Sequence, residues 1–279
     1  MNKIAVLGSG LLGGSIALAA QSRMQGVAVV LWGRREDSIR EAKELGITYA
    51  TTDLGDAVSE ADMIILATPV GAMLQILDSV SKIKSLKDII ITDVGSVKLT
   101  PRDTLEAVAQ AAGACYIGSH PMAGSEQAGI HAARANLFMG AACVITNDFN
   151  HSEEKVTLLR DFWEALGCEC YQTSSEEHDR VMARISHLPH LLASVGALVG
   201  LKYSEDRKFA GNGLRDTTRV ASGHPAMWAE ILLRNRGAIK EPIEEAIGHL
   251  RDVLAFLEDS SEEQLERLLN DAKQHRDNL

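Results

Sequence analysis

Short hydrophobic runs alternate with longer amphipathic segments along the first two thirds of the chain. Each run has the length of a strand, and the runs lie at residues 3–7, 27–32, 63–67, 89–91, 115–117, 142–146 and 168–172. The segments between them have the length of helices, for example at 70–80, 100–112 and 152–166. Strands that alternate with helices indicate a parallel sheet with helices on its faces, which is an α/β fold.

The pattern changes after residue 173. Ser174-Ser175-Glu176-Glu177 has the sequence of a helix-capping signature, and no strand-like run follows it. We therefore predict an α/β domain over residues 1–173 and an all-helical domain over residues 174–279. By analogy with other chains of this plan, we expect the helical domain to pair with that of a second copy, which makes the protein a homodimer.

A glycine-rich segment, Gly8-Ser9-Gly10-Leu11-Leu12-Gly13, follows the first strand-like run directly. A dinucleotide-binding Rossmann fold carries such a segment between its first strand and its first helix. The glycines allow the turn, and the N–H groups at the start of the helix favour the anionic pyrophosphate. The α/β domain is therefore predicted to be of the Rossmann type, with Gly8, Gly10, Leu11, Leu12 and Gly13 at the cofactor.

The second strand-like run ends in Gly33-Arg34-Arg35, about twenty residues further on, where NAD-binding sites place an acidic residue. An acid accepts a hydrogen bond from the ribose 2′-hydroxyl, whereas arginines pair with a 2′-phosphate. We expect Arg34 and Arg35 to favour NADP, with NAD as the alternative if the two arginines are merely solvated at a helix start.

Polar residues follow several of the predicted strands at the edge where open α/β sheets bind their ligands. Thr68 and Pro69 follow the run at 63–67, and Ser96 follows the run at 89–91. His120 follows the run at 115–117, in a segment rich in glycine and proline that we expect to form a tight turn. Because the unperturbed pKa of histidine is about 6.5, His120 suits the acceptance of a hydroxyl proton during hydride removal.

The predicted helical domain carries two further groups of polar residues. His187 and His190 are spaced to share a helix face, but no third ligand stands at a recognisable spacing, so we predict no metal site. Arg215 and Arg219 also share a face, as a clamp for carboxylates or as ordinary helix salt bridges with Asp216 as a partner.

Composition limits the possible partners. The formal net charge is −10, which argues against nucleic acid and anionic membrane surfaces. The longest apolar stretch, at 191–201, is too short to cross a bilayer, and the N-terminus lacks the pattern of a signal peptide. The four cysteines lack metal-ligand spacing, so we expect a cytoplasmic protein with reduced thiols.

Taken together, these motifs resemble the prephenate and arogenate dehydrogenases of tyrosine biosynthesis, over nearly the whole chain. The segments that carry the resemblance are 8–13, 68–69, 93–98, 119–124, 136–138, 186–190, 215–219 and 225–228. The chain stops after the helical domain, so we expect neither a regulatory ACT domain nor a fused chorismate mutase.

The resemblance implies an oxidative decarboxylation of prephenate to 4-hydroxyphenylpyruvate, with hydride transfer to NADP or NAD. It makes His120 the acceptor of the hydrogen bond from the ring hydroxyl, Ser96 the residue that orients it beside the cofactor, and Arg219 the anchor of a substrate carboxylate. The other residues that it places at or near the substrate are Ser125, Glu126, Ser186, His190, Arg215 and Trp228.

Three other functions remain as alternatives. An arogenate dehydrogenase would bind an ammonium group, which Glu126 would attract. A β-hydroxyacid dehydrogenase would need a catalytic lysine, but Lys202 and Lys208 lack the neighbouring asparagine of that pattern. A non-catalytic NADP(H)-sensing protein would need the dinucleotide site without His120, Ser96 and Arg219.

Overall fold

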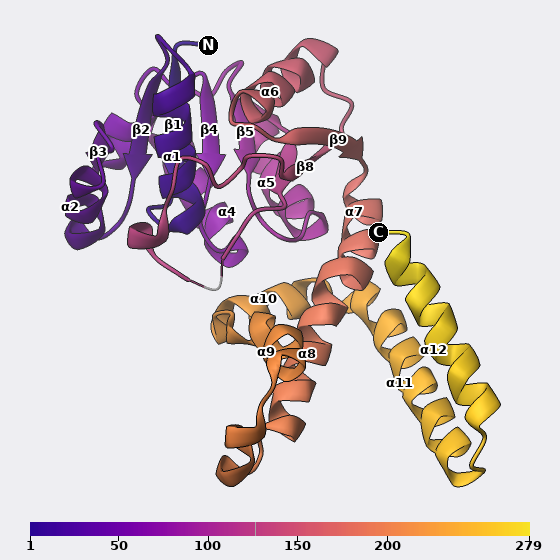
Figure 1. Ribbon diagram of the computed structural model, residues 1–279. Helices are drawn as coiled ribbons and strands as arrows, with labels where there is room; N and C mark the ends of the chain where they lie inside the picture. Colours follow the sequence, from indigo (N-terminus) through magenta and orange to yellow (C-terminus); the bar gives the residue numbers. More distant parts are fainter. Residues whose placement is uncertain (126) are drawn as a thin grey trace.

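Six parallel strands form the centre of the first part of the chain in the computed structural model, which describes residues 1–125 and 127–279 (Figure 1). Their order across the sheet is β3-β2-β1-β4-β5-β6. The strands are β1 (Lys3–Leu7), β2 (Ala28–Trp32), β3 (Ala50–Thr51), β4 (Met63–Leu66), β5 (Ile90–Asp93) and β6 (Cys115–Tyr116). This confirms the predicted parallel α/β sheet, whose carboxyl ends lie at one common edge.

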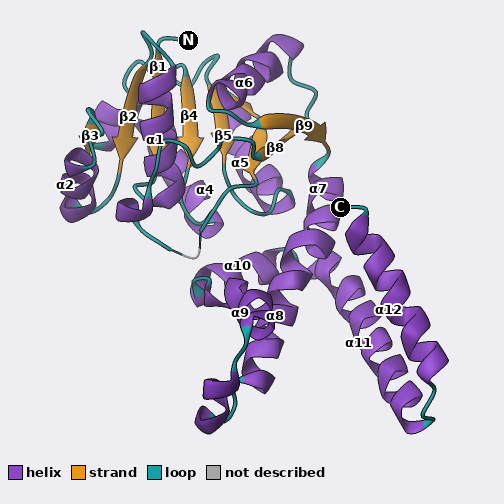
Figure 2. Cartoon of the chain, in the orientation of Figure 1, coloured by secondary structure: helices purple, strands orange, loops and turns teal. Residues whose placement is uncertain are grey.

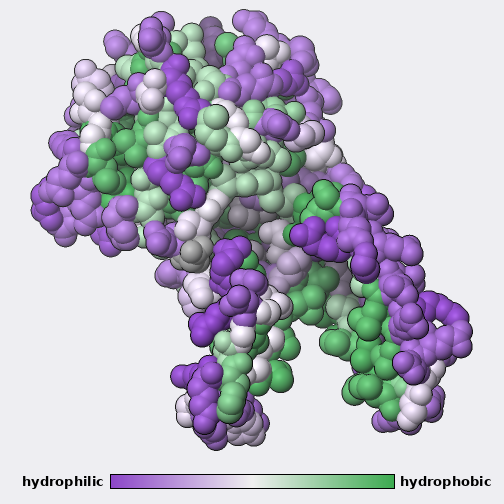
Figure 3. All heavy atoms as spheres, viewed as in Figure 1, coloured by the Kyte–Doolittle hydropathy of each residue, from purple (hydrophilic) through white to green (hydrophobic). Residues whose placement is uncertain are grey.

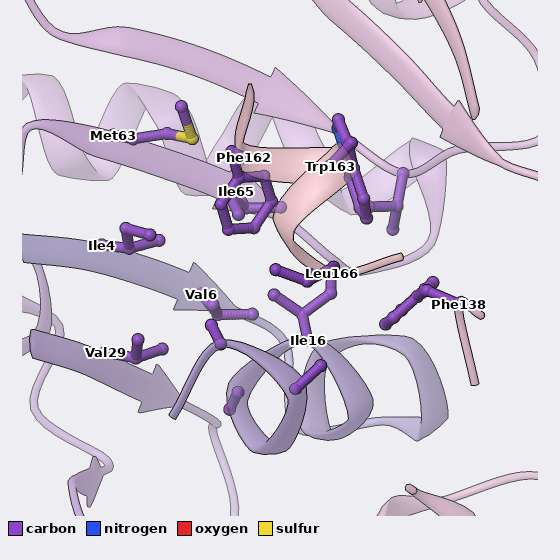
Figure 4. Packing of buried hydrophobic residues seen from close by; sticks show 14 of the residues in the cluster. Ile4, Val6, Ile16, Val29, Met63, Ile65, Phe138, Phe162, Trp163 and Leu166 are labelled. Atoms are coloured by element: carbon purple, nitrogen blue, oxygen red, sulfur yellow. The ribbon is translucent and has the colours of Figure 1, made fainter. Parts of the chain in front are cut away.

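Helices cover both faces of this sheet. They are α1 (Leu11–Arg23), α2 (Glu36–Glu44), α3 (Leu54–Val58), α4 (Val70–Ile83), α5 (Leu99–Ala111) and α6 (Glu153–Ala165). Side chains alternate along β1, so that Ile4 and Val6 join one buried cluster and Ala5 and Leu7 join the other. Figure 4 shows the first cluster, in which Ile4 and Val6 lie with side chains of α1 and α6.

A second, three-stranded sheet lies beyond β6. It contains β7 (Gly118–Pro121), β8 (Ala142–Thr146) and β9 (Glu169–Thr173), with β7 antiparallel and β9 parallel to β8, and the short helix η1 (Ile130–Ala132) lies between β7 and β8. The prediction of a tight turn at His120 was therefore wrong, because His120 lies within β7 and pairs with Val144. Pro121 is compatible with this strand because β7 is at the edge of its sheet, where a missing N–H costs no ladder bond.

Helices make up the rest of the described chain after β9 (Figure 2). They are α7 (Ser175–Met182), the π-helical turn η2 (Ala183–His187), α8 (Leu188–Gly200), η3 (Ser204–Phe209), α9 (Asn212–Thr218), η4 (Arg219–Ser222), α10 (Pro225–Arg234), α11 (Arg236–Glu258) and α12 (Glu262–Asp277). The Ser174 hydroxyl accepts the Glu177 N–H at 3.1 Å, as a capping residue does. Pro189 has no N–H to donate back along the helix, and the wider turn η2 precedes it.

Two arms of helices extend from the α/β part, one formed around α8 and α9 and the other by α11 and α12 (Figure 1). Helix α10 lies close to the α/β part, and its residue Glu230 accepts a hydrogen bond from the Gly71 N–H at the start of α4. No helix among the described residues is both long and apolar enough to cross a membrane.

Candidate active site

The turn from β1 to α1 is built so closely that side chains are excluded from it. Gly8 has φ +138°, and a Cβ atom there would lie 2.3 Å from the Ala67 carbonyl oxygen. A Cβ atom at Gly13 would lie 1.8 Å from the carbonyl oxygen of Gly8. Gly10 is the N-cap of α1, with no side-chain cap and no acidic residue in the first turn, which begins with Leu11 and Leu12. The helix start therefore suits an anionic pyrophosphate.

Two neighbouring strand ends complete the dinucleotide site. Thr68 lies after β4 and before Pro69. Its hydroxyl is buried without a hydrogen-bond partner among the described residues, so it is available to bind a ligand. A Cβ atom at Gly33, after β2, would lie 2.2 Å from Ser9 Oγ, so the end of β2 touches the glycine-rich turn. Arg34 and Arg35 follow Gly33 directly and are exposed.

His120 is the buried histidine that the sequence places at this edge, with 7% of its surface exposed. Its Nδ1 atom lies 2.8 Å from Nε2 of His178 on α7, whose own Nδ1 atom lies 2.7 Å from Asp179 Oδ1. Sequence reasoning missed His178 and Asp179, because their contact with His120 spans 58 residues and no local spacing signals it. His178 is thus a hydrogen-bond partner of His120, and the orienting role of Ser96 stays a prediction.

A buried charged group lies beneath His120. The Lys98 ammonium pairs with Asp93 Oδ1 and donates to the Ser119 carbonyl at 2.8 Å, and the Tyr116 hydroxyl donates to Asp93 Oδ2 at 2.7 Å. Burial lowers the pKa of His120 well below its ordinary value, and the neighbouring His178, Lys98 and His187 lower it further. His120 is therefore a neutral base at neutral pH.

His187 links the helical part to the loop after β5. Its Nδ1 atom lies 3.0 Å from Asn235 Nδ2, which also donates to the Asp179 carbonyl at 2.8 Å. Burial lowers the pKa of His187 to about 4, and the backbone of Ser96 lies next to its ring. The half-buried Ser96 is thus held between the α/β part and the helical part.

His190 and Trp228 form the next layer of the site. Their rings stack with centroids 3.6 Å apart and planes 10° apart, and Trp228 also meets His187 edge to face. Burial lowers the pKa of His190, while the backbone at Val220 raises it. Because Val220 follows Arg219, the segment with the predicted carboxylate anchor lies against His190.

The remaining predicted residues lie at different depths. Ser186 is half-buried in η2, whereas Arg215 and Arg219 are exposed on α9 and η4. Ser125 is exposed, and its hydroxyl accepts the Gln127 N–H at 3.1 Å. Glu126 lies outside the described residues. The structure thus joins His120, Ser96, His190 and Trp228 through His178 and His187, while Arg215 and Ser125 stay at the surface.

Comparisons with known proteins agree with this geometry. Residues 16–172 match the family model of the prephenate dehydrogenase nucleotide-binding domain, and residues 174–271 match that of the prephenate dehydrogenase dimerization domain. The prephenate dehydrogenase of Bacillus subtilis is 33% identical over 282 residues, which cover 99% of this chain and 76% of the relative.

Two solved structures are similar over almost the whole chain. Prephenate dehydrogenase from A. aeolicus, in complex with hydroxyphenyl propionate and NAD⁺, has a TM-score of 0.88 at 30% identity and covers 99% of this chain and 97% of its own. Arogenate dehydrogenase from Synechocystis has a TM-score of 0.78 at 30% identity, with 99% of both chains covered.

Two consecutive family models, a dinucleotide turn and a buried neutral histidine at the same sheet edge lead to one assignment. The protein belongs to the prephenate dehydrogenase family and is an NAD(P)-dependent prephenate dehydrogenase of tyrosine biosynthesis.

Proposed function

We propose that this enzyme prefers prephenate to arogenate and NADP⁺ to NAD⁺, and that it acts as a homodimer with His120 as its base. The buried, neutral His120 at the carboxyl edge of the sheet is the observation that carries the proposal. The choice of prephenate is supported by the prephenate dehydrogenase of Bacillus subtilis, at 33% identity, and by that of A. aeolicus, whose TM-score of 0.88 exceeds the 0.78 of the Synechocystis arogenate dehydrogenase.

The proposed reaction removes a hydride from one ring carbon and, for the time of the transfer, a proton from the hydroxyl group on that carbon. A bound nicotinamide supplies the hydride acceptor. Nε2 of His120 accepts the hydrogen bond of the ring hydroxyl and takes up its proton as hydride leaves the carbon. The carboxylate on the opposite ring carbon leaves as CO₂, and its bonding electron pair completes the aromatic ring. His120 then returns the proton to the phenolic oxygen and ends the cycle neutral.

The other site residues have proposed roles of binding and orientation. The Ser96 hydroxyl contacts the same substrate oxygen or the nicotinamide, and the Arg219 guanidinium holds a substrate carboxylate, because a charge-assisted contact is strong and directional. The proposed pocket also includes Ser125, Glu126, Ser186, His190, Arg215 and Trp228.

The cofactor preference rests on the end of β2. Arg34 and Arg35 are both exposed there, and the adjoining Gly33 lies against the glycine-rich turn. A 2′-phosphate at this position would meet two guanidinium groups, which suit phosphate by charge and by geometry. This supports NADP⁺, although the solved relative from A. aeolicus holds NAD⁺.

The homodimer rests on apolar surface in the helical part. Ile247, Leu250, Leu254 and Leu257 follow one face of α11 and are 41%, 60%, 60% and 58% exposed; we call them the α11 stripe. Figure 3 shows hydrophobic residues gathered on the facing sides of the two arms. Exposed apolar surface of this extent marks an interface. Because residues 174–271 match a dimerization domain, we propose that a second copy of this chain covers the α11 stripe.

Steady-state turnover on the four pairs of prephenate or arogenate with NADP⁺ or NAD⁺ tests the proposal. The highest kcat/KM is expected for prephenate with NADP⁺, and sedimentation of the same sample is expected to give a dimer. A higher kcat/KM for arogenate would reverse the substrate assignment, and a higher kcat/KM with NAD⁺ would reverse the cofactor assignment.

A further inference from the structure

We propose that Asp179 and His178 are positioning residues that hold His120 in the one tautomer whose Nε2 atom is free to accept a proton. This inference rests on the proposed role of His120 as the base. It goes further in assigning a task to two residues of the helical part, neither of which touches the reacting atoms.

The arrangement starts from Asp179 of α7, whose buried side chain contacts the first backbone N–H groups of α5. Its Oδ1 atom accepts the Lys98 N–H at 2.7 Å, and its Oδ2 atom accepts the Leu99 N–H at 3.0 Å. Each oxygen of this carboxyl group thus already accepts a backbone N–H, and as a carboxylate the group has no proton to donate. The ring nitrogen that lies 2.7 Å from Oδ1, His178 Nδ1, must therefore be the donor.

The tautomers of the two histidines follow in sequence. Burial lowers the pKa values of His178 and His120, so both rings are neutral at neutral pH. A neutral imidazole carries its proton on one nitrogen and accepts on the other. With its proton on Nδ1, His178 accepts through Nε2, so the contact at 2.8 Å requires His120 Nδ1 to donate. His120 Nε2 then has a free lone pair.

Chemistry at His120 needs this tautomer. The opposite tautomer would present an N–H to the substrate hydroxyl and could not take its proton. Once His120 is protonated, its Nδ1–H donates to His178, and the Asp179 carboxyl group lies one ring further along. The groups that face these rings are Lys98 and Asp93 from the α/β part and His187 from η2.

A matched pair of substitutions at His178 tests the inference. Glutamine and methionine have similar shape, but only the glutamine side chain offers a carbonyl oxygen as an acceptor for His120 Nδ1–H. We expect His178→Met to lower kcat by roughly 10²-fold, within the usual range for acid–base help, and His178→Gln to recover about 10-fold of that loss. The KM for prephenate and the Kd for NADP⁺ are expected to stay within about 2-fold for both variants, since neither ligand touches His178.

Equal kcat values for the two variants, or a loss confined to KM, would overturn the inference. A second measurement needs no substitution at His178. In ¹⁵N-histidine-labelled full-length protein, with the His120 signals assigned by their loss in His120→Asn, we expect a protonated Nδ1 and an unprotonated Nε2. The reverse pattern would refute the inference even if the His178 variants failed to fold. An unchanged kcat in His120→Asn would instead refute the proposed base, so the two failures are distinguishable.

Discussion

The α/β part and the helical part of this chain bury their hydrophobic residues to very different degrees. The α/β part has two buried clusters, one on each face of its six-stranded sheet. Among the described residues after 173, the buried aliphatic and methionine side chains are those of Met182, Ala183, Ala193, Ile231 and Ile239. The helical part also exposes large residues such as Leu198 at 76% and Phe209 at 77%. The α/β part has its own core, whereas the helical part leaves apolar surface that the proposed homodimer would cover.

The site follows the same division. The α/β part supplies the glycine-rich turn and His120, whereas the helical part supplies His178, His187 and His190. Because those histidines lie on the part that the proposed homodimer would cover, we expect the dimer to stabilise them as well. We therefore expect turnover to depend on the oligomeric state and cofactor binding to depend on the α/β part.

Breaking the proposed interface is expected to change the molecule most, because both its mass and its turnover should change. Leu250→Glu with Leu254→Glu places two charges on the α11 stripe, whose burial against a partner would then be strongly unfavourable. We expect the dimer to dissociate and kcat to fall by at least about 10-fold as the helical part loses its cover. Sedimentation and turnover measure the two effects.

Leu45→Glu is the matched control for that variant. Leu45 is 39% exposed at the end of α2 in the α/β part, far from the α11 stripe in the chain. It should leave both mass and turnover unchanged. A double variant that stays dimeric would show that α11 does not form the interface.

The next prediction concerns cofactor binding by the α/β part alone. In Gly13→Ala the new methyl group would lie 1.8 Å from the Gly8 carbonyl oxygen, so the turn must shift. We expect the Kd for NADP⁺ to rise by roughly 10-fold or more, since about 1.4 kcal/mol of lost contact suffices. Gly237→Ala in α11 is the control, because a Cβ atom at Gly237 meets nothing within 4 Å and the residue lies outside the glycine-rich turn. The Kd is measured by calorimetric titration. An equal rise in Kd for both substitutions would contradict the importance of the close contact between Gly13 and Gly8.

A smaller effect concerns acid stability and belongs to the helical part. Burial lowers the pKa of His187 to about 4, so below its ordinary value of 6.5 the unfolded chain takes up a proton that the folded chain does not. Stability is therefore complete above about pH 6.5 and is lost as the pH falls toward 4, by on the order of 3 kcal/mol for this group. His120, His178 and His190 act in the same direction.

The thermal unfolding temperature at pH 7 and pH 5 checks this prediction. His187→Gln should reduce the difference between the two values, whereas His275→Gln, on the exposed end of α12, should leave it as in the wild type. A wild-type unfolding temperature that is unchanged at pH 5 would argue against buried neutral histidines.

The smallest expected effect lies at the end of β2. Arg34→Ala with Arg35→Ala should raise the Kd for NADP⁺ by about 10-fold through the loss of charge-assisted phosphate contacts, while the Kd for NAD⁺ holds. Arg40→Ala is the control, because Arg40 lies on the helix α2 that follows Arg35 and is paired with Asp37. If the Kd values for both cofactors rise alike, the arginines do not bind the 2′-phosphate.

Local patterns in the sequence predicted the strands of the parallel sheet except the two-residue β3, and also the glycine-rich turn and the start of α7, because each depends on neighbouring residues. They did not predict β7, since glycine and proline signal a turn and only pairing with the distant β8 makes residues 118–121 a strand. The contact of His120 with His178 and the buried pair of Lys98 and Asp93 were missed for the same reason. These are products of tertiary packing, without a periodicity of their own.

His120→Asn, assayed with saturating prephenate and NADP⁺, tests the central claim most directly. The amounts of 4-hydroxyphenylpyruvate and reduced cofactor formed per unit time are compared with those of the wild type, and NADP⁺ binding is measured by titration. The buried neutral base predicts that kcat falls by roughly 10²–10⁴-fold while the Kd for NADP⁺ stays the same. An unchanged kcat would contradict the claim that His120 takes the proton of the ring hydroxyl.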